Sequence, residues 1–275
     1  MKNNPELFNN DQKLFTDAAQ YYTKYRPKYE SEFFDYIIDS FKLDGKGRLL
    51  DLGCGTGQLA IPFAKNFEEV IGLDPEKGML EEAKKEAKKA GVKNIKWVLS
   101  KAEEITKKMG TFRLVTMGAS FHWMKQEEVL EKIYNLTEKN GGVVIMYDTS
   151  YSMGWEKKDI GQWKKIRLDI LKKYLGEKRR AGNSFYKKPE KTFEDLLDDS
   201  SFGNHEKWTH EYVRTWTIDT IIGFIYSTSF AAPRLFGNRI REFEEELKTE
   251  LLKIEPSGIF KEKVRIEALL ARKHN

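Results

Sequence analysis

Two carboxylates and three glycines form the part of the sequence whose residue types and spacing best suit chemistry. In the segment LLDLGCGTG, Asp51 precedes Gly53, Gly55 and Gly57. Glycines at such a turn permit positive φ angles and let a ligand lie against the backbone. The next apolar run ends in Asp74. A carboxylate at the end of a second strand is placed to accept both hydroxyls of a ribose.

The spacing of these glycines narrows the ligand class. Dehydrogenases and flavoproteins use G-x-G-x-x-G, whose third glycine supports helix packing around a pyrophosphate. Here the third glycine comes one residue early, and no Arg or Lys lies in the turn to meet a phosphate. The pattern therefore predicts a site for an adenosine-like nucleoside without phosphates. A tight turn without a ligand is the alternative, which the following acid disfavours.

A second candidate is His122 in the segment GASFHWMK. It follows the fourth predicted strand, and open α/β sheets bind ligands at the carboxyl ends of their strands. Three interpretations are open. His122 acts as a general base, for which an unperturbed pKa near 6.5 is well matched. Otherwise it orients a substrate by hydrogen bonding, or it only packs against Trp123.

The elements that must position these residues are short apolar runs separated by helical patterns. The expected strands are 48–53, 70–74, 95–100, 114–120 and 143–148. Most are apolar at consecutive positions, which is typical of strands covered on both faces. Residues 43–150 are therefore predicted to form the cofactor-binding core, a doubly wound, mostly parallel α/β sheet.

The flanking regions predict additions to this core. Residues 1–42 are expected to form an N-terminal helical cap, with helix over 11–42. Residues 151–200 and 218–256 are expected to be helical insertions that serve an acceptor, and 151–200 shows no strand pattern. Residues 201–217 and 257–275 are expected to add strands, and the whole chain is expected to form a single compact unit.

Composition excludes several classes of protein. The net charge of +5 over 275 residues is dispersed, so we expect neither nucleic acid nor a membrane as partner. A single cysteine, Cys54, suits a reducing cytoplasm, and we expect it to be small and buried. The N-terminal residues lack the apolar region of a signal peptide. With no H-E-x-x-H motif and one cysteine, a metal site is not expected.

The motifs together resemble the class I S-adenosylmethionine-dependent methyltransferases. The matching segments follow the order of that family: LLDLGCGTG, GLDP, SKAEEI, FRLVTMGASFHWM and NGGVVIMYD. The resemblance is greatest to small-molecule enzymes of the trans-aconitate methyltransferase type, which have a similar aromatic entry segment, here YYTKYRPKY, and a similar FHW. It implies S-adenosylmethionine as methyl donor, S-adenosylhomocysteine as product, and no metal.

The resemblance also implies roles for individual residues. Gly53, Gly55 and Gly57 would contact the methionine moiety, with Asp51 near its amino group and Asp74 on the ribose. Further cofactor contacts are implied for Tyr22, Arg26, Met79, Ala102, Glu103 and Ser120. The sequence departs from the family at Lys101, where an Asp often stands, and at Arg113, which replaces an Asp.

The implied reaction moves a methyl group to a small organic acceptor, with a carboxylate or hydroxyl oxygen favoured. An enzyme that acts on RNA or protein is an alternative, although the [DNS]-P-P-[YFW] signature is absent. A non-catalytic nucleoside-binding module of the same fold is another. Candidate acceptor residues, each of which also has a purely structural interpretation, are Trp123, Trp155, Trp163, Arg167, Tyr226, Ser229 and Arg234. The sequence leaves the oligomeric state open.

Overall fold

The computed structural model describes residues 17–148, 160–181, 184–185 and 190–274. The chain divides into two compact units. We call them the helical unit (Met1–Pro27, Asp148–Lys188 and Glu211–Arg265) and the core unit (Lys28–Tyr147, Pro189–His210 and Ile266–Asn275). Each unit has its own cluster of buried apolar side chains.

Parallel strands form the centre of the core unit. Their bounds are β1 Arg48–Leu52, β2 Glu69–Asp74, β3 Ile95–Leu99, β4 Phe112–Gly118 and β5 Thr137–Asp148. They lie in the order β3-β2-β1-β4-β5, and every neighbouring pair is parallel. After β3 the chain crosses to the other side of β1 to form β4. The strand order therefore reverses between β1 and β4, where doubly wound sheets bind ligands.

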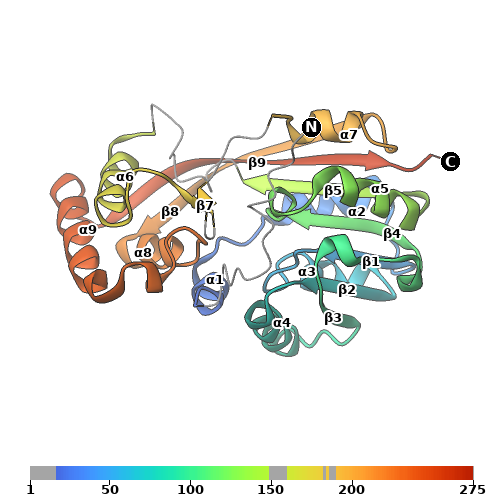
Figure 1. The fold of residues 1–275 in the computed structure, drawn as a ribbon, viewed down its shortest axis with the longest axis horizontal. Coiled ribbons are helices and arrows are strands. Elements are labelled where there is room, and N and C mark those ends of the chain that lie inside the picture. Colours follow the sequence, from blue (N-terminus) through green and yellow to red (C-terminus); the bar gives the residue numbers. More distant parts are fainter. Residues whose placement is uncertain (1–16, 149–159, 182–183, 186–189, 275) are drawn as a thin grey trace. The chain divides into compact units, whose positions relative to one another are not determined.

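Two long strands complete the seven-stranded sheet. These are β8 (His205–Thr217) and β9 (Ile259–Arg272), which follow β5 in the order β5-β9-β8 and lie close to their predicted ranges. Each contributes residues to both units. Figure 1 shows β9 running opposite to β4 and β5. The sheet is therefore mixed but mostly parallel, which confirms the predicted fold class.

Helices cover the strands of the core unit. Their bounds are α2 Ser31–Phe41, α3 Ala60–Phe63, α4 Lys77–Lys89, α5 Gln126–Leu136 and α7 Phe193–Asp198. Short 3₁₀ turns are η2 Ala64–Asn66, η3 Ala102–Glu104, η4 Lys107–Met109 and η5 Phe121–Trp123. Leu196 and Leu197 of α7 join the core cluster, so this part of 151–200 belongs to the core unit.

The helical unit is built from α1 Ala19–Tyr25, α6 Gln162–Leu175, α8 Ile218–Tyr226 and α9 Ile240–Ile254, with 3₁₀ turns η6 Pro233–Leu235 and η7 Gly237–Arg239. The α1 helix packs against α8 at a glycine. A Cβ on Gly223 would lie 2.2 Å from Cγ of Tyr25, so only glycine admits the ring. Two short antiparallel strands, β6 Arg180–Ala181 and β7 Ser184–Phe185, lie in a stretch for which no strand was expected.

Pro27 ends the first helix, so the helix expected over 11–42 is wrong as one continuous element. Arg26 has an extended conformation (φ −67°, ψ 128°), as the steric demand of a following proline requires. The α2 helix begins only at Ser31. Within the described residues, no helix is long and apolar enough to cross a membrane.

Candidate functional site

The glycine turn after β1 has the conformation that its sequence predicts. Gly53, Gly55 and Gly57 have φ angles of 64°, 54° and 86°, which side chains of L-residues disfavour. Space is also limited, because a Cβ on Gly53 would lie 2.5 Å from the Cβ of Ser120. The turn therefore needs glycine both for its backbone angles and for its close approach to the residues after β4.

Asp51 is buried between β1, β4 and α3. Its carboxylate accepts a hydrogen bond from Thr116 Oγ1 at 2.8 Å and one from the backbone N–H of Ala60 at 3.2 Å. The side chain is 1% exposed, and this burial raises the pKa of Asp51 to about 7. Through these two hydrogen bonds Asp51 connects β4, where the strand order reverses, to α3, the helix that follows the glycine turn.

Asp74 links the end of β2 to the glycine turn. Its two carboxylate oxygens accept hydrogen bonds from the backbone N–H groups of Gly55 and Glu76, both at 2.8 Å. The residue is 6% exposed, and burial raises the pKa of its carboxyl to about 6. The sequence predicted that Asp74 and the glycine turn belong to one site, and the structure brings them into contact at the carboxyl ends of β1 and β2.

Other residues expected at the cofactor lie on the connections that leave the same ends of the strands. Met79 is buried in the first turn of α4 and Ala102 is buried in η3. Glu103 accepts a hydrogen bond from the backbone N–H of Lys125 at 2.7 Å, which joins η3 to the start of α5. Ser120 Oγ is also engaged, because it donates to the carbonyl of Leu52 at 2.7 Å.

His122 lies in the exposed 3₁₀ turn η5, directly after β4. Ala119, three residues before it, has a φ of 53°, an unusual value for a residue with a Cβ. The imidazole is exposed and lies beside Trp123, with ring centroids 4.8 Å apart. The ring contact with Trp123 is compatible with a packing role, and the exposure of the imidazole is compatible with contact to a ligand. The interpretations as a base, as an orienting residue and as a packing partner of Trp123 all stay open.

Tyr22 and Arg26 belong to the helical unit. There the guanidinium of Arg26 lies over the ring of Tyr22, 4.8 Å from its centroid, and 5.1 Å from that of Phe224. Cation–π contacts of this kind hold the guanidinium against the two aromatic rings. Their predicted contact with the cofactor stays a prediction.

The acceptor candidates differ in their surroundings. Arg167 is buried in α6 with its guanidinium 5.2 Å from the ring centroid of Trp163, and burial lowers its pKa to about 10. Tyr226 is a core residue whose hydroxyl donates to Glu244 at 2.9 Å. Ser229 is buried and Arg234 is exposed. Trp155 lies outside the described residues.

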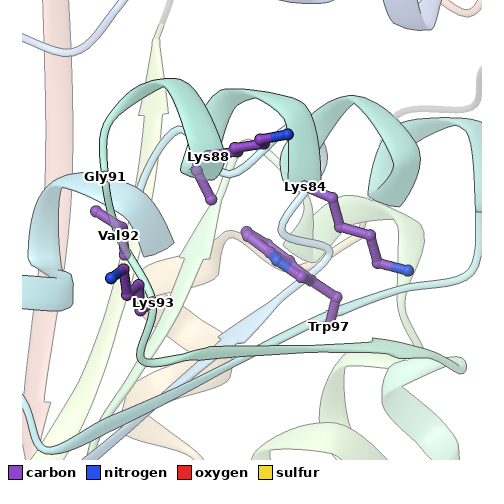
Figure 2. A pocket seen from close by; sticks show the side chains of 7 residues that line it. Lys84, Lys88, Gly91, Val92, Lys93 and Trp97 are labelled. Carbon is purple, nitrogen blue, oxygen red and sulfur yellow. The ribbon is translucent and has the colours of Figure 1, made fainter.

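A separate hollow of about 240 Å³ lies between α4 and β3 (Figure 2). Its lining comes from α4, from the connection between α4 and β3, and from β3 itself. Its wall includes the indole of Trp97, which also backs the turn. A Cβ on Gly72 would lie 2.6 Å from this indole and one on Gly57 3.0 Å.

Sequence patterns did not reveal the partner of Asp51. Thr116 stands opposite Asp51 in the β1–β4 register, but β1 and β4 are far apart in the chain. Knowing that pairing requires the strand order, and the strand order does not follow from periodicity. Within the residues that the structure covers, no group of three or more His, Cys, Asp or Glu side chains could hold a metal ion.

Comparisons with known proteins agree with this geometry. Residues 49–141 match the family model of a methyltransferase domain. A Dictyostelium discoideum protein named as a methyltransferase is 28% identical over 87% of this chain and 85% of its own. A probable S-adenosylmethionine-dependent methyltransferase of Saccharomyces cerevisiae is 26% identical over 59% of this chain and 61% of its own.

A solved structure shares the fold at low identity. It is a phosphoethanolamine N-methyltransferase of Haemonchus contortus in complex with phosphomonomethylethanolamine and S-adenosylhomocysteine. It has a TM-score of 0.56 and 16% identity, covering 96% of this chain and 58% of that one. The narrower likeness to trans-aconitate methyltransferases stays a prediction. The domain match, the named relatives and the fold show that residues 49–141 form a methyltransferase domain of the class I S-adenosylmethionine-dependent type.

Proposed function

We propose that the chain transfers a methyl group from S-adenosylmethionine to a carboxylate or hydroxyl oxygen of a small organic acceptor. The observation that carries the cofactor part is the Asp74 carboxylate, which accepts a hydrogen bond from the N–H of Gly55. This bond brings a ribose-type acid to a turn of glycines, whose backbone a ligand can approach closely because glycine has no side chain. The residues present therefore fit the cofactor.

In this proposal the glycine turn binds the methionine moiety and Asp51 lies near its amino group. Asp74 accepts hydrogen bonds from the ribose hydroxyls. Adenine lies among residues of the connections after β2 and β3: Met79, Ala102 and Glu103. Ser120 borders the methionine end, and Tyr22 and Arg26 are the proposed partners of its carboxylate.

The donor supplies an electrophilic methyl group on a positively charged sulfur, and an acceptor oxygen displaces it in line. The protein then contributes proximity, alignment and exclusion of water. A carboxylate acceptor arrives ionised and needs no base, whereas a hydroxyl usually does. His122, exposed directly after β4, is the candidate to orient the acceptor or to take that proton.

The helical unit supports the small, anionic or aromatic class of acceptor. In it several guanidinium groups lie on aromatic rings: Arg26 on Phe224, Arg167 on Trp163, Arg179 on Phe230 and Arg214 on Trp216. Planar cations and rings recognise carboxylates and flat apolar groups. The residues proposed to line the acceptor are Trp123, Trp155, Trp163, Arg167, Ser229 and Arg234, while Tyr226 is accounted for by the core.

Calorimetric titration tests the cofactor part. We expect the wild-type protein to bind S-adenosylmethionine and Asp74→Ala to bind it at least about tenfold more weakly, because ribose and Gly55 lose one shared acceptor. Asp35→Ala removes an exposed carboxylate of α2 and should leave the affinity unchanged. Unchanged affinity of Asp74→Ala would show that this acid does not hold the ribose.

A labelled methyl donor tests the acceptor part. We expect label in one or a few acids or hydroxyl compounds when the protein is incubated with a metabolite mixture. Label in RNA or protein would overturn the proposed acceptor class. Tight cofactor binding without transfer to metabolites, RNA or protein would favour the non-catalytic binding module.

A further inference from the structure

The hollow between α4 and β3 contains none of the residues proposed for the donor or the acceptor. It lies within the core unit and is lined by Lys84, Ala87, Lys88, Gly91, Val92, Lys93 and Trp97. A cavity of about 150 Å³ holds one benzene-sized ring. The volume of this hollow, about 240 Å³, therefore suits a ring that carries one small polar group.

The end of α4 gives the hollow one of its walls. Gly91 has a φ of 70°, and its N–H donates to the carbonyl of Lys88 at 3.1 Å. The N–H of Val92 donates to the carbonyl of Ala87 at 2.9 Å. These two bonds close the helix in a Schellman turn and satisfy two of its last carbonyls. The turn brings the connection to β3 back beside the helix.

The indole of Trp97 provides a flat apolar surface in this hollow. Figure 2 shows it between α4 and β3, with Lys84 on one side and Val92 on the other. The indole is held in place, because a Cβ on Gly72 would lie 2.6 Å from it and one on Gly57 3.0 Å. A ligand ring that packs on a held indole gains contact area without first ordering that side chain.

Three lysines surround this apolar surface. Lys84, Lys88 and Lys93 line the hollow and are exposed, and among the described residues no carboxylate forms an ion pair with them. A lysine in the last turn of a helix suits the helix dipole, which accounts for Lys88. It does not account for Lys84, which lies more than one turn before the end of α4. The three charges are available to an anion in the hollow.

Other lysines of the same helix differ from these. Lys85 pairs with Glu82 and Lys89 with Glu86, both at 2.6 Å. A long polyanion that lay along α4 would meet these lysines as well as those of the hollow. A small ligand inside the hollow would meet only the lysines that line it. The paired lysines therefore provide a matched control.

We propose that the hollow is a binding site for a small aromatic acid. The ring of the acid packs on the indole of Trp97, and its carboxylate lies among Lys84, Lys88 and Lys93. Ring and charge are both required, because an exposed ion pair alone contributes little to affinity. The site is additional to the proposed function, since it needs neither the methyl donor nor its acceptor.

Nuclear magnetic resonance with benzoate as the probe tests the proposal. The indole N–H signal of Trp97 is assigned by its absence from the spectrum of Trp97→Phe. We expect benzoate to shift this signal in a saturable way. Benzamide has the same ring without the charge, and we expect its Kd, measured from the same signal, to be at least about threefold higher.

Two double variants show which lysines take part. Lys84→Gln/Lys88→Gln and Lys85→Gln/Lys89→Gln each remove two charges that are four residues apart on α4. We expect the first to raise the Kd of benzoate at least about threefold and the second to change it by less than about twofold. The dispersion of each spectrum shows that the variant is folded.

Three results would overturn the proposal. The first is a Trp97 signal that benzoate leaves in place, even where the protein binds benzoate elsewhere. The second is an equal Kd for benzoate and benzamide, which would mean that the charge is not recognised. The third is equal weakening by both double variants, which would indicate attraction to the whole basic face of α4 and not a site in the hollow.

Discussion

At the scale of single residues, the cofactor site holds two carboxylates in conditions that disfavour their charge. Asp51 and Asp74 are both buried, and burial raises their pKa values to about 7 and about 6. A buried carboxylate costs free energy unless hydrogen bonds compensate it, and each here accepts two. The site therefore gives up some stability of the empty protein to keep acceptors ready for a ligand.

Asp51→Asn tests this through the pH dependence of stability. Burial raises the pKa of this carboxyl to about 7 in the folded protein, against an ordinary value of 3.8 for an aspartate side chain. Between these values the folded protein binds a proton that the unfolded chain has released, so the free energy of unfolding falls as pH rises. We expect the free energy of unfolding of the ligand-free Asp51→Asn variant to exceed that of the wild type by more than about 1 kcal/mol at pH 8.

Urea unfolding of both proteins at several pH values measures this difference. It should be greatest near pH 8 and shrink as the pH falls toward 4, because the wild-type carboxyl becomes protonated first in the folded protein and then, below about pH 3.8, in the unfolded chain as well. A difference that does not vary from pH 4 to pH 8 would mean that Asp51 titrates normally. The Asn variant should also bind S-adenosylmethionine more weakly, because an ionised acceptor near the amino group is lost.

His122 provides a separate residue-scale prediction. Since its ring is exposed, we expect His122→Ala to raise the KM of the acceptor about fivefold through one lost hydrogen bond, with kcat little changed from pH 6 to pH 8. His122→Gln, which keeps a hydrogen-bonding group, should recover most of the loss. A kcat that falls about a hundredfold would instead assign the general-base role.

At the scale of elements, the sequence predicted the strands better than the helices. Consecutive apolar residues mark β1, β2, β4 and β5 because both of their faces are covered. The break at Pro27 was missed because the aromatic residues on both sides continue a helical pattern. The β6–β7 pair was missed because two-residue strands are too short to show alternation. Likewise the Asp51–Thr116 contact depends on the strand order, which local patterns do not contain.

Trp97 of the β3 strand packs against the glycine turn. Trp97 fills the space behind Gly57 and Gly72 and forms the wall of the hollow in Figure 2. We expect Trp97→Ala to lower the free energy of unfolding by at least about 2 kcal/mol, because the turn loses its packing partner. The affinity for S-adenosylmethionine should fall as well.

Urea unfolding and calorimetry measure the two effects. Lys84→Ala is the control, since Lys84 lines the same hollow but its side chain is exposed, and it should change neither quantity. Trp97→Phe keeps a ring and should lie between the alanine variant and the wild type. A loss of stability with unchanged affinity would show that the turn keeps its shape without the indole.

At the scale of the whole molecule, the two units contain different residues that are proposed to bind ligands. The glycine turn, Asp51 and Asp74 are all in the core unit, whereas Arg167 and Trp163 are in the helical unit. The matched methyltransferase domain, residues 49–141, lies entirely within the core unit. Relatives can therefore share the cofactor chemistry while the residues proposed for the acceptor differ.

Arg167 of the helical unit is proposed to act on the acceptor and not on the donor, so its variants should affect the acceptor alone. Arg167 is buried beside Trp163 and is attracted by Glu262, so its guanidinium acts in surroundings where charge is weakly screened. With an acceptor from the labelling screen, we expect Arg167→Gln to raise the acceptor KM at least about tenfold. The Kd of S-adenosylmethionine should change by less than about twofold, because its proposed partners Asp51 and Asp74 are intact.

Arg265→Gln removes an exposed arginine of the same unit and should change neither constant. Thermal unfolding must accompany Arg167→Gln, because the loss of a buried cation leaves Glu262 with less compensation. If the variant is folded and loses affinity for the donor and the acceptor in parallel, Arg167 does not act on the acceptor alone. If only the acceptor KM rises, Arg167 of the helical unit contributes to recognition of the acceptor.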